Sequence, residues 1–393
     1  MKLKDAVSIL DHRRIPVSAA ERAHRAKVYP YYGAQGIVDY IDDYLFDGEY
    51  VLVAEDGNNL KSLAEPIVTW ATGKFWVNNH AHILGDCGVA NVRYVYYYLM
   101  ARDLRGLITG SAQPKFNQDN LANFNLDLPD RATQDKVANL LAAIDNKIVN
   151  NKKLRAELEA AAQLIYDYWF TQFDFNDEDG KPYRTSGGKM TWSDELKRSI
   201  PSGWTIGVLS DYLHLEKDTV IPIPGQIYEH YSIPAFDDGR FPTLDDGSSI
   251  DSGKYRVHGG CILYSKLNPK FKRLWQPYCL TDDAICSTEF LVMQPEKPQY
   301  QGFCLSMLHS SAFYTHMVSK AISSTGSRSR VDPEVALNFT FARPTDKLVD
   351  QFGTLVMPLF SQIQKLEIEN HELASLRDWL LPMLMNGQAT IGE

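Results

Sequence analysis

Asn338-Phe-Thr-Phe-Ala-Arg-Pro344 leads into a helical pattern that reaches about Leu380, and it repeats an arrangement that the chain has already used. The first copy, Asn123-Phe-Asn-Leu-Asp-Leu-Pro129, lies 215 positions earlier and also leads into a long helical pattern. The two lead-ins share their asparagine, phenylalanine and proline. This duplication predicts a repeated plan for the 393 residues, in which a globular segment comes before each helix.

Both helical patterns carry an apolar column in which every seventh residue is in register. Asn151 is the single polar member among the ten positions, which are Val137, Ile144, Asn151, Leu158, Ile165, Phe352, Leu359, Leu366, Leu373 and Leu380. A 3.5-residue apolar repeat of this length is typical of helices that pack along their length as a coiled coil. We expect the helices to run from about Arg131 to Phe170 and from about Asp346 to Met385, with Asn386-Gly387 ending the second one.

The remaining sequence predicts two globular domains of the α+β class. In the first, short strand-like runs are separated by turn residues and followed by a helix; the runs are 37–41, 50–54, 66–70, 74–77 and 81–84, and the helix is 92–105. In the second, core strands are expected at 255–257, 261–264 and 289–293. The expected organisation is a first domain (1–128), a helical region (129–173), a polar linker (174–203), a second domain (204–343) and a second helical region (344–393).

Composition and charge narrow the class of protein. No apolar run approaches the roughly 20 residues needed to cross a bilayer, and no signal-peptide pattern follows Met1. The five cysteines never occur as Cys-x-x-Cys, which suits a reducing compartment, so we expect a cytoplasmic protein without a membrane partner. The net charge of −9 argues weakly against nucleic acid, but basic residues gather locally, as in Lys266–Arg273 and Ser327–Arg330.

A search for catalytic motifs gives no candidate. None of the four Gly-Lys pairs belongs to a phosphate-binding loop, and neither a dinucleotide-binding fingerprint nor a nucleophile elbow is present. His80-x-His82 could offer two metal ligands, but no third ligand stands at a recognisable spacing, so surface histidines or base contacts are favoured. We therefore expect no catalytic residue, no metal and no cofactor in this chain.

Side chains suited to nucleic acid occur in both domains. Basic groups contact phosphates, whereas Arg, Lys, Asn, Gln and aromatic groups contact base edges. The candidates in the first domain are Arg13, Arg14, Tyr31, Tyr32, Gln35, Asn78, Asn79, His80, Gln113 and Lys115. Those in the second are Lys266, Asn268, Lys270, Lys272, Arg273, Arg328 and Arg330. Each could instead be an ordinary surface or packing residue. Two domains held apart by helices could occupy major-groove segments about 34 Å apart, which favours an asymmetric two-part duplex target.

Several stretches together resemble the DNA-specificity subunits of type I restriction–modification enzymes. In the first half they are Tyr29-Pro-Tyr-Tyr-Gly-Ala-Gln-Gly-Ile-Val-Asp39, Leu45-Phe-Asp-Gly-Glu-Tyr50, Ala54-Glu-Asp-Gly57, Asn78-Asn-His80 and Trp169-Phe170. In the second half they are Ile200-Pro-Ser-Gly-Trp204, Tyr231-Ser-Ile-Pro-Ala-Phe236 and Ser265-Lys-Leu-Asn-Pro269. The resemblance covers essentially the whole chain, because the order of domains and helical regions is also that of the family.

The resemblance implies a fold and a set of partners. It implies two target-recognition domains separated by two antiparallel helices that form a coiled-coil spacer, with an internal pseudo-two-fold repeat. It also implies two methyltransferase subunits that use S-adenosylmethionine to modify adenine, and two motor-nuclease subunits that can join them in an ATP-dependent enzyme. This chain would supply DNA recognition and no catalysis.

Two other classes of function stay open at this point. The chain could be an enzyme in its own right, a lone methyltransferase or nuclease, although the motif search counts against this. It could also be a coiled-coil scaffold with two ligand-binding domains and no role at DNA. Binding to duplexes at varied salt separates these classes, because phosphate contacts impose a steep salt dependence.

Overall fold

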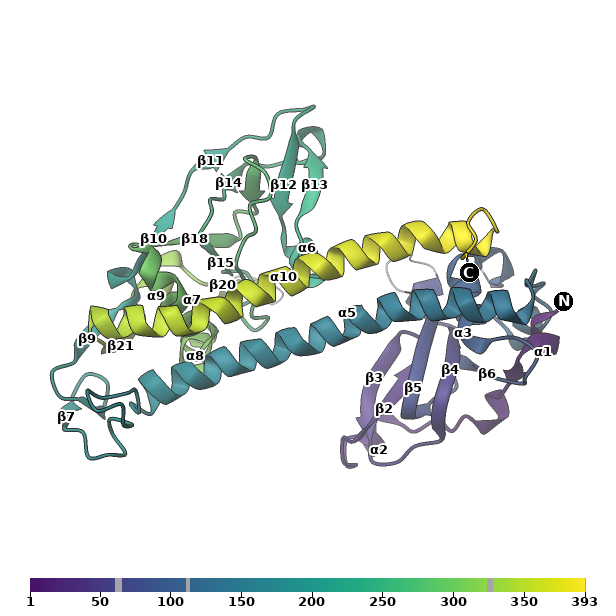
Figure 1. Cartoon of the computed structure of the whole chain (residues 1–393), viewed down its shortest axis with the longest axis horizontal. Helices are drawn as coiled ribbons and strands as arrows, with labels where there is room; N and C mark the ends of the chain where they lie inside the picture. The colour runs from purple at the N-terminus through teal and green to yellow at the C-terminus, as the bar shows by residue number, and fades with distance from the viewer. Residues whose placement is uncertain (61–65, 111–113, 324–327, 393) are drawn as a thin grey trace. The chain divides into compact units, whose positions relative to one another are not determined.

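The computed structural model describes residues 1–60, 66–110, 114–323 and 328–392 (Figure 1). It divides into two compact units, the first formed by Met1–Asn146 with Leu373–Glu393 and the second by Lys147–Glu372. Two long helices, α5 (Arg131–Tyr166) and α10 (Asp346–Met385), contribute one part to each unit.

The two long helices begin at equivalent places in the repeat. The Asp130 side chain accepts a hydrogen bond from the backbone of Thr133, and the Thr345 hydroxyl accepts one from the backbone of Leu348. These caps follow the two prolines of the lead-ins and satisfy backbone donors of each first turn. At its end α5 passes into a π-helical turn at Asp167–Thr171, whereas α10 stops where Gly387 takes a φ of 68°. The expected end at Asn386-Gly387 is confirmed.

The first unit is built on a six-stranded sheet in the order β1-β6-β4-β5-β2-β3. Its strands are β1 (Ser8–Ile9), β2 (Tyr29–Gly33), β3 (Gly36–Ile41), β4 (Phe46–Ala54), β5 (Val68–Val77) and β6 (Ala81–Gly85). β2 and β5 run parallel, and the other neighbours are antiparallel. The short helices are α1 (Leu3–Ala6), α2 (Ala19–Arg22), α3 (Val92–Met100) and α4 (Gln118–Ala122).

β5 is one strand where the sequence predicts two. The expected break falls at Gly73, which has a φ of 76° and pairs in register with Gly48, whose φ is 137°. Glycine adopts such angles without steric cost, so the pairing of β4 with β5 continues through this position. The helix expected at 92–105 is shorter than predicted and ends at Met100.

Alternation along β4 places side chains on both faces of this sheet. Val51 and Val53 join a core formed with α3, α5 and α10, whereas Phe46 and Leu52 join a second core on the opposite face. Successive side chains of a strand point to opposite faces, and here both faces are covered. Both faces of β4 are therefore covered, whereas the edge strand β3 is largely exposed.

The second unit contains two larger sheets, with strand orders β10-β18-β15-β16 and β11-β14-β17-β12-β13. The first sheet consists of β10 (Leu213–Glu216), β15 (Ile262–Ser265), β16 (Leu274–Trp275) and β18 (Phe290–Pro295). The second consists of β11 (Thr219–Val220), β12 (Ile227–Tyr231), β13 (Thr243–Asp246), β14 (Lys254–Arg256) and β17 (Ala284–Cys286). Its shorter helices are α6 (Ile233–Asp237), α7 (Gln301–His309), α8 (Ser311–Ser319) and α9 (Pro333–Leu337).

Three two-stranded ribbons complete the second unit. They are β7 (Met190–Ser193) with β8 (Arg198–Pro201), β9 (Thr205–Val208) with β21 (Thr340–Arg343), and β19 (Ile322–Ser323) with β20 (Ser329–Arg330). The first ribbon lies inside 174–203, where the sequence predicts a polar linker. That segment is folded, and Phe175 and Ile200 from it are buried in the largest core of this unit.

In each unit α5 and α10 share a core and run in opposite directions. Asp145 of α5 contacts Arg377 of α10 in the first unit. In the second unit Lys147 and Asn151 contact Glu369, and Arg155 contacts Glu367. Of the ten positions of the apolar column, five are buried and five are half-buried; the buried ones are Val137, Ile144, Asn151, Phe352 and Leu366.

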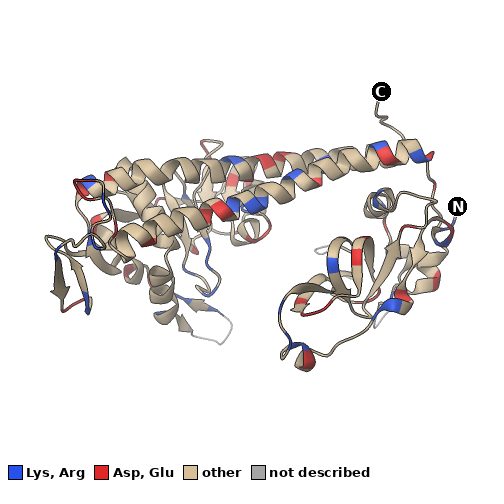
Figure 2. Cartoon of the chain, turned by 60° about the horizontal axis from the view of Figure 1, so that its bottom comes forward, with Lys and Arg blue, Asp and Glu red and all other residues tan. Residues whose placement is uncertain are grey.

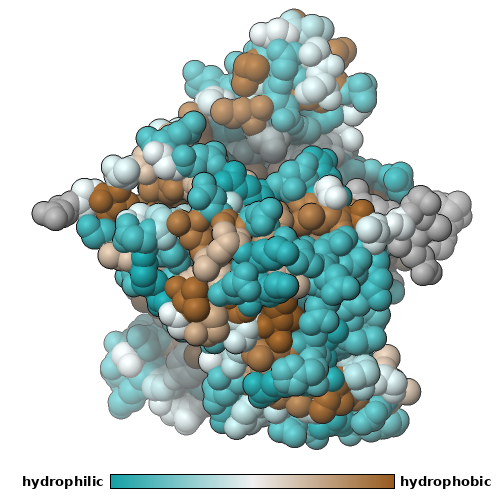
Figure 3. Space-filling model, turned by 90° about the vertical axis from the view of Figure 1, so that its right-hand side faces the viewer, coloured by the Kyte–Doolittle hydropathy of each residue, from teal (hydrophilic) through white to brown (hydrophobic). Residues whose placement is uncertain are grey.

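The exposed surface is of mixed polarity. On the face of the molecule that Figure 3 presents, hydrophobic groups form small areas between hydrophilic ones. Large apolar side chains are nevertheless exposed along both long helices, among them Leu154, Leu164, Leu355, Leu376 and Trp379. None of the helices in the described part of the chain combines the length and the apolar character that a membrane crossing needs.

Candidate nucleic-acid interface

Three turns of the first unit meet around a hollow of about 330 Å³. Gln35 comes from the turn between β2 and β3, Asp56 and Asn58 follow β4, and Asn78 and His80 come from the turn between β5 and β6. Gln35, Asn78 and His80 are candidates from the sequence, and the structure brings them together although they are far apart in the chain. Asn79 is exposed on the same turn as His80.

His80 is held in place by its neighbours while about half of its side chain stays exposed. Its ring Nδ1 lies 2.8 Å from an Asp56 carboxylate oxygen, and its backbone N–H donates to the Asn78 side chain at 2.8 Å. The Asp56 carboxylate can accept only from a protonated Nδ1, and Nε2 is the other hydrogen-bonding atom of the ring. Amide, imidazole and carboxylate groups around one hollow offer both donors and acceptors to a polar ligand such as a base edge.

A network of charged side chains surrounds Glu55, which comes just before Asp56. Arg14 Nη1 lies 2.7 Å and Lys115 Nζ 2.9 Å from the Glu55 carboxylate. Burial raises the pKa of Glu55, but the hydrogen bonds from Arg14 and Lys115 outweigh burial, and the net pKa is lowered. Arg14 also donates to the carbonyl oxygen of Ala81, and only 16% of its side chain is exposed, whereas 56% of Lys115 is exposed. Arg14 therefore supports the fold, and Lys115 is the accessible cation.

The two candidate tyrosines of this unit are buried. Tyr31 is 1% exposed and its hydroxyl hydrogen-bonds to the backbone of Val17, whereas Tyr32 is 8% exposed and packs on Phe75. Their side chains point to opposite faces of β2, each of which is covered by a core cluster. Neither ring is thus available at the surface.

The other two candidates of the first unit lie elsewhere. Arg13 is exposed, and its guanidinium lies over the Phe46 ring with its central carbon 4.6 Å from the ring centre. Gln113 falls outside the described residues.

In the second unit the two basic segments that the sequence singles out are adjacent. The backbone N–H of Asn268 donates to Ser329, and that of Val331 donates to Lys266, at 2.8 and 3.1 Å. Arg330 pairs with Glu289 at 2.6 Å, and this pairing, with Lys266 and Arg328 nearby, lowers the pKa of Glu289. In Figure 2 blue ribbon borders the undescribed residues 324–327 of this unit. Three cations therefore gather around one carboxylate.

Three further candidates of the second unit serve the fold. Asn268 has a φ of 48°, and its side-chain oxygen accepts from the backbone N–H of Ser329, so it shapes a turn. Lys272 donates to the carbonyl oxygen of His309, and burial lowers the pKa of this lysine. Arg273 makes two hydrogen bonds to Asp237, at 2.7 and 2.8 Å. Lys266 is half-buried, whereas Lys270, Arg328 and Arg330 are exposed.

Sequence reasoning missed the acidic members of both clusters. Glu55, Asp56 and Glu289 hold basic or imidazole groups in place, yet acidic residues near turns are common for conformational reasons. The one available signal is that Glu55 and Asp56 belong to Ala54-Glu-Asp-Gly57, one of the stretches on which the family resemblance depends.

Comparisons with known proteins relate the first part of this chain to a described domain family. A family model described as the type I restriction modification DNA specificity domain matches residues 1–160. A putative type I restriction enzyme specificity subunit of Haemophilus influenzae is 33% identical over 142 residues, 36% of this chain and 36% of that protein. The type I restriction enzyme MjaIX specificity subunit of Methanocaldococcus jannaschii is 24% identical over 331 residues, 79% of this chain and 72% of that protein. The match to the Haemophilus protein thus spans little more than a third of its length.

A solved structure extends the likeness to the fold of almost the whole chain. The crystal structure of the type I restriction–modification system S subunit from M. genitalium superimposes with a TM-score of 0.61 and 14% sequence identity. The superposition covers 98% of this chain and 95% of that one, so the two share a fold. Residues 1–160 therefore match a type I restriction modification DNA specificity domain, and the chain as a whole shares the fold of that S subunit.

Proposed function

We propose that this chain is a non-catalytic subunit that reads an asymmetric, two-part DNA sequence and directs methyltransferase and restriction subunits to it. The observation that carries this proposal is that each of the two units exposes its own cluster of polar and basic side chains. The clusters differ in composition, since amides and an imidazole dominate one and guanidinium and ammonium groups the other. Different chemistry suits two different half-sites.

Within each cluster the accessible side chains are the proposed contacts. In the first unit they are Gln35, Asn78, Asn79, His80 and Lys115, and in the second Lys266, Lys270, Arg328 and Arg330. The neighbouring carboxylates of Asp56 and Glu289 repel phosphate, but they orient His80 and Arg330, and a carboxylate can also accept from the amino group of cytosine. Arg13 is a further exposed cation and is proposed to contact phosphate.

The proposed organisation assigns 1–128 and 204–343 to target-recognition domains, and 129–173 and 344–393 to the helical spacer. Contacts at the base of each domain support an internal pseudo-two-fold repeat. Leu3 donates its backbone N–H to Phe124 at 2.9 Å, and Leu209 donates its own to Phe339 at 3.0 Å. The opposite directions of α5 and α10 in each unit support an antiparallel coiled coil, whose length sets the spacing of the half-sites.

The catalytic steps are proposed to belong to partner subunits. Two methyltransferase subunits would supply adenine methylation with S-adenosylmethionine, and two motor-nuclease subunits could add ATP-dependent cleavage. The large apolar side chains exposed on the two helices, such as Leu164 at 67% and Trp379 at 63%, suit protein contacts along the spacer.

The experiment that tests this proposal has two steps. Mapping methylated bases in DNA from cells that carry the chain and its methyltransferase partner should give a motif of two specified parts separated by unspecified bases. Duplexes with and without that motif are then titrated with the purified complex at several salt concentrations. Specific duplexes should bind more tightly, and affinity should fall steeply with salt, with a log–log slope of about −0.9 for each phosphate contact.

A scaffold with two ligand-binding domains and no role at DNA makes the opposite prediction. It gives no methylated motif that depends on this chain and no salt-dependent binding to any duplex. Methylation of DNA by the isolated chain with S-adenosylmethionine alone would instead identify an enzyme, and either result overturns the proposal.

A further inference from the structure

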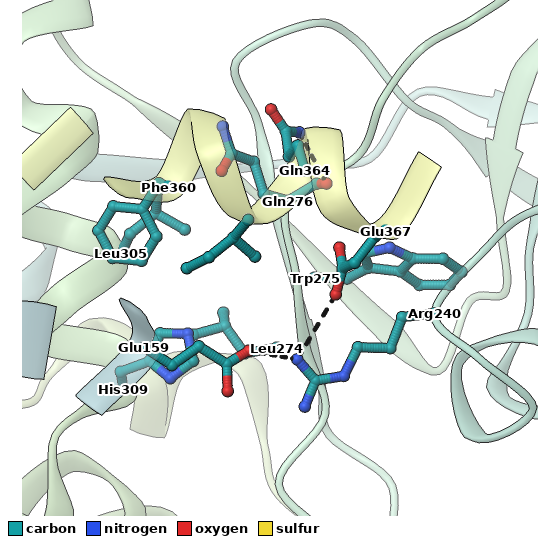
Figure 4. Close-up of a pocket in the computed structure, with 11 residues that line it drawn as sticks. Glu159, Arg240, Leu274, Trp275, Gln276, Leu305, His309, Phe360, Gln364 and Glu367 are labelled. Carbon is teal, nitrogen blue, oxygen red and sulfur yellow. Dashed lines mark hydrogen bonds and ion pairs between the residues drawn. The ribbon is translucent and has the colours of Figure 1, made fainter. Parts of the chain in front are cut away.

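In the second unit, a tyrosine of the folded domain binds a carboxylate of one long helix. The Tyr278 hydroxyl lies 2.8 Å from the Glu367 carboxylate of α10 and 2.7 Å from the carbonyl oxygen of Arg240, so its single proton has these two acceptors. The same carboxylate lies 3.4 Å from Arg155 of α5 and 3.8 Å from Arg240. Arg240 in turn contacts Glu159 of α5 at 2.6 Å (Figure 4). The domain, α5 and α10 therefore meet at one carboxylate.

The central carboxylate of this network is shielded from water. Glu367 is 7% exposed, and burial raises its pKa although the Tyr278 hydroxyl and the two arginines oppose that shift. Two arginines pair with two glutamates beside a cavity of only about 30 Å³. A buried charge that loses a partner is strongly destabilised, so such a network tolerates few alternative geometries.

The first unit contains the same chemistry with the helices exchanged. Tyr97 of α3 is fully buried, and its hydroxyl donates to Asp145 of α5 at 2.6 Å. The other oxygen of Asp145 lies 3.0 Å from Arg377 of α10. Here the carboxylate comes from α5 and the arginine from α10, whereas in the second unit α10 supplies the carboxylate and α5 an arginine.

We infer that Tyr97 and Tyr278 are specificity-determining residues for the length of the unread spacer in the DNA target. Each hydroxyl orients its recognition domain on a carboxylate that also contacts the other long helix. The carboxylate therefore couples the orientation of the domain to the register of the two helices. This inference rests on the proposed two-part target. It adds that spacing depends on two hydroxyl groups as well as on the length of the helices.

The required accuracy follows from the geometry of DNA. One additional base pair moves a half-site by about 3.4 Å and rotates it by about 34° around the duplex. A domain whose orientation on the helices can vary should bind targets with a spacer one base pair longer or shorter more readily than a domain whose orientation is fixed. Buried polar groups at helix contacts are known to specify register more than they add stability.

The test compares duplexes whose spacer is correct, one base pair shorter or one base pair longer, bound by the full chain in complex with its methyltransferase subunit. Tyr97→Phe and Tyr278→Phe keep the packed ring and remove only the hydroxyl. The ratio of affinities for correct over altered spacers should fall by about tenfold in each single variant, as expected for one hydrogen bond to a charged group, and further in the double variant. Base preference within each half-site should stay unchanged.

Two matched variants serve as controls. The Tyr98 hydroxyl accepts from the backbone of Asp127, and the Tyr314 hydroxyl donates to Lys270, so neither contacts the long helices. Tyr98→Phe and Tyr314→Phe should leave the ratio unchanged. An unchanged ratio in the double variant, or an equal loss at every spacer length, overturns the inference. If the wild-type complex itself does not distinguish spacer lengths, the two-part target of the proposed function fails.

Discussion

The side-chain amide of Asn151 on α5 donates a 2.7 Å hydrogen bond to the Glu369 carboxylate on α10, and only 3% of Asn151 is exposed. Asn151 is the one polar residue in the apolar column, and its position is explained by this acceptor on the facing helix. Lys147 contacts the same carboxylate at 3.3 Å. A single polar contact within an apolar seam favours one register, because sliding either helix leaves the amide without a partner.

Replacing Asn151 should therefore destabilise the chain. Asn151→Ala removes a buried hydrogen bond to a charged group and should lower the free energy of unfolding by about 1–3 kcal/mol. Urea unfolding followed by circular dichroism measures the change. Asn150 is exposed on the same helix, so Asn150→Ala should change stability by less than about 0.5 kcal/mol. Equal effects of the two changes would contradict a special role for Asn151.

Glu55 should make stability depend on pH. Its pKa is lowered in the folded protein from the ordinary value of 4.5, so the unfolded state binds more protons as the pH falls. The resulting stabilisation is present above the unfolded pKa and is lost as the pH falls through the folded pKa. Glu55→Gln should thus be less stable than the wild type at pH 7, and the difference should shrink as the pH falls below the ordinary value of 4.5.

Urea unfolding of both proteins across this pH range tests the Glu55 prediction. Glu157 is exposed on α5, and Glu157→Gln serves as the control that should follow the wild type. If the difference in free energy of unfolding between Glu55→Gln and the wild type stays constant with pH, the charge of the Glu55 carboxylate is not the cause of that difference.

Arg328 should contribute to DNA binding through one half-site. Arg328→Ala should weaken DNA binding by about 1–3 kcal/mol if the guanidinium contacts a base. Altering the base pairs of that half-site should then reduce the DNA affinity of the variant less than it reduces the affinity of the wild type. Titration of fluorescent duplexes with either half-site altered measures both effects. Lys181, which is exposed and pairs only loosely with Asp179 at 3.9 Å, provides the control variant Lys181→Ala. Equal losses for both variants would indicate a non-specific effect of charge.

Gly353 should be intolerant of a methyl group although it lies within α10. A Cβ atom at this position would lie 2.8 Å from the carbonyl oxygen of Gln299, closer than real contacts allow. The clash should cost about 1–3 kcal/mol, which exceeds the gain of up to about 1 kcal/mol in helix propensity. Gly353→Ala should therefore lower the midpoint of thermal unfolding. Thr354→Ala at the adjacent exposed position should not, and a stabilised Gly353→Ala would refute the close approach.

The long helices were predictable because their signals are local. The two prolines, the seven-residue column and the Asn386-Gly387 stop predict the bounds of α10 and the start of α5. The end of α5 lies at Tyr166, and the π-helical turn after it covers the residues that the sequence assigned to the helix as far as Phe170.

The errors arise where partners distant in sequence decide the structure. Gly73 does not break β5, because Gly48 lies opposite it in the ladder. Tyr31 and Tyr32 lie on opposite faces of one strand, and sequence alone does not reveal that both faces are covered. The roles of Arg14, Lys272 and Arg273 depend likewise on carboxylates and carbonyl groups that only the fold brings near.

The pairing at the base of each domain has a practical consequence for engineering. β9 and β21 lie side by side, and Leu3 likewise meets Phe124, so the chain enters and leaves each domain at neighbouring points. A foreign domain inserted between these points needs only two adjacent junctions and leaves the helices uncut. Each domain is thus attached to the long helices through one pair of adjacent junctions, so that a domain could be exchanged as a unit at these two points.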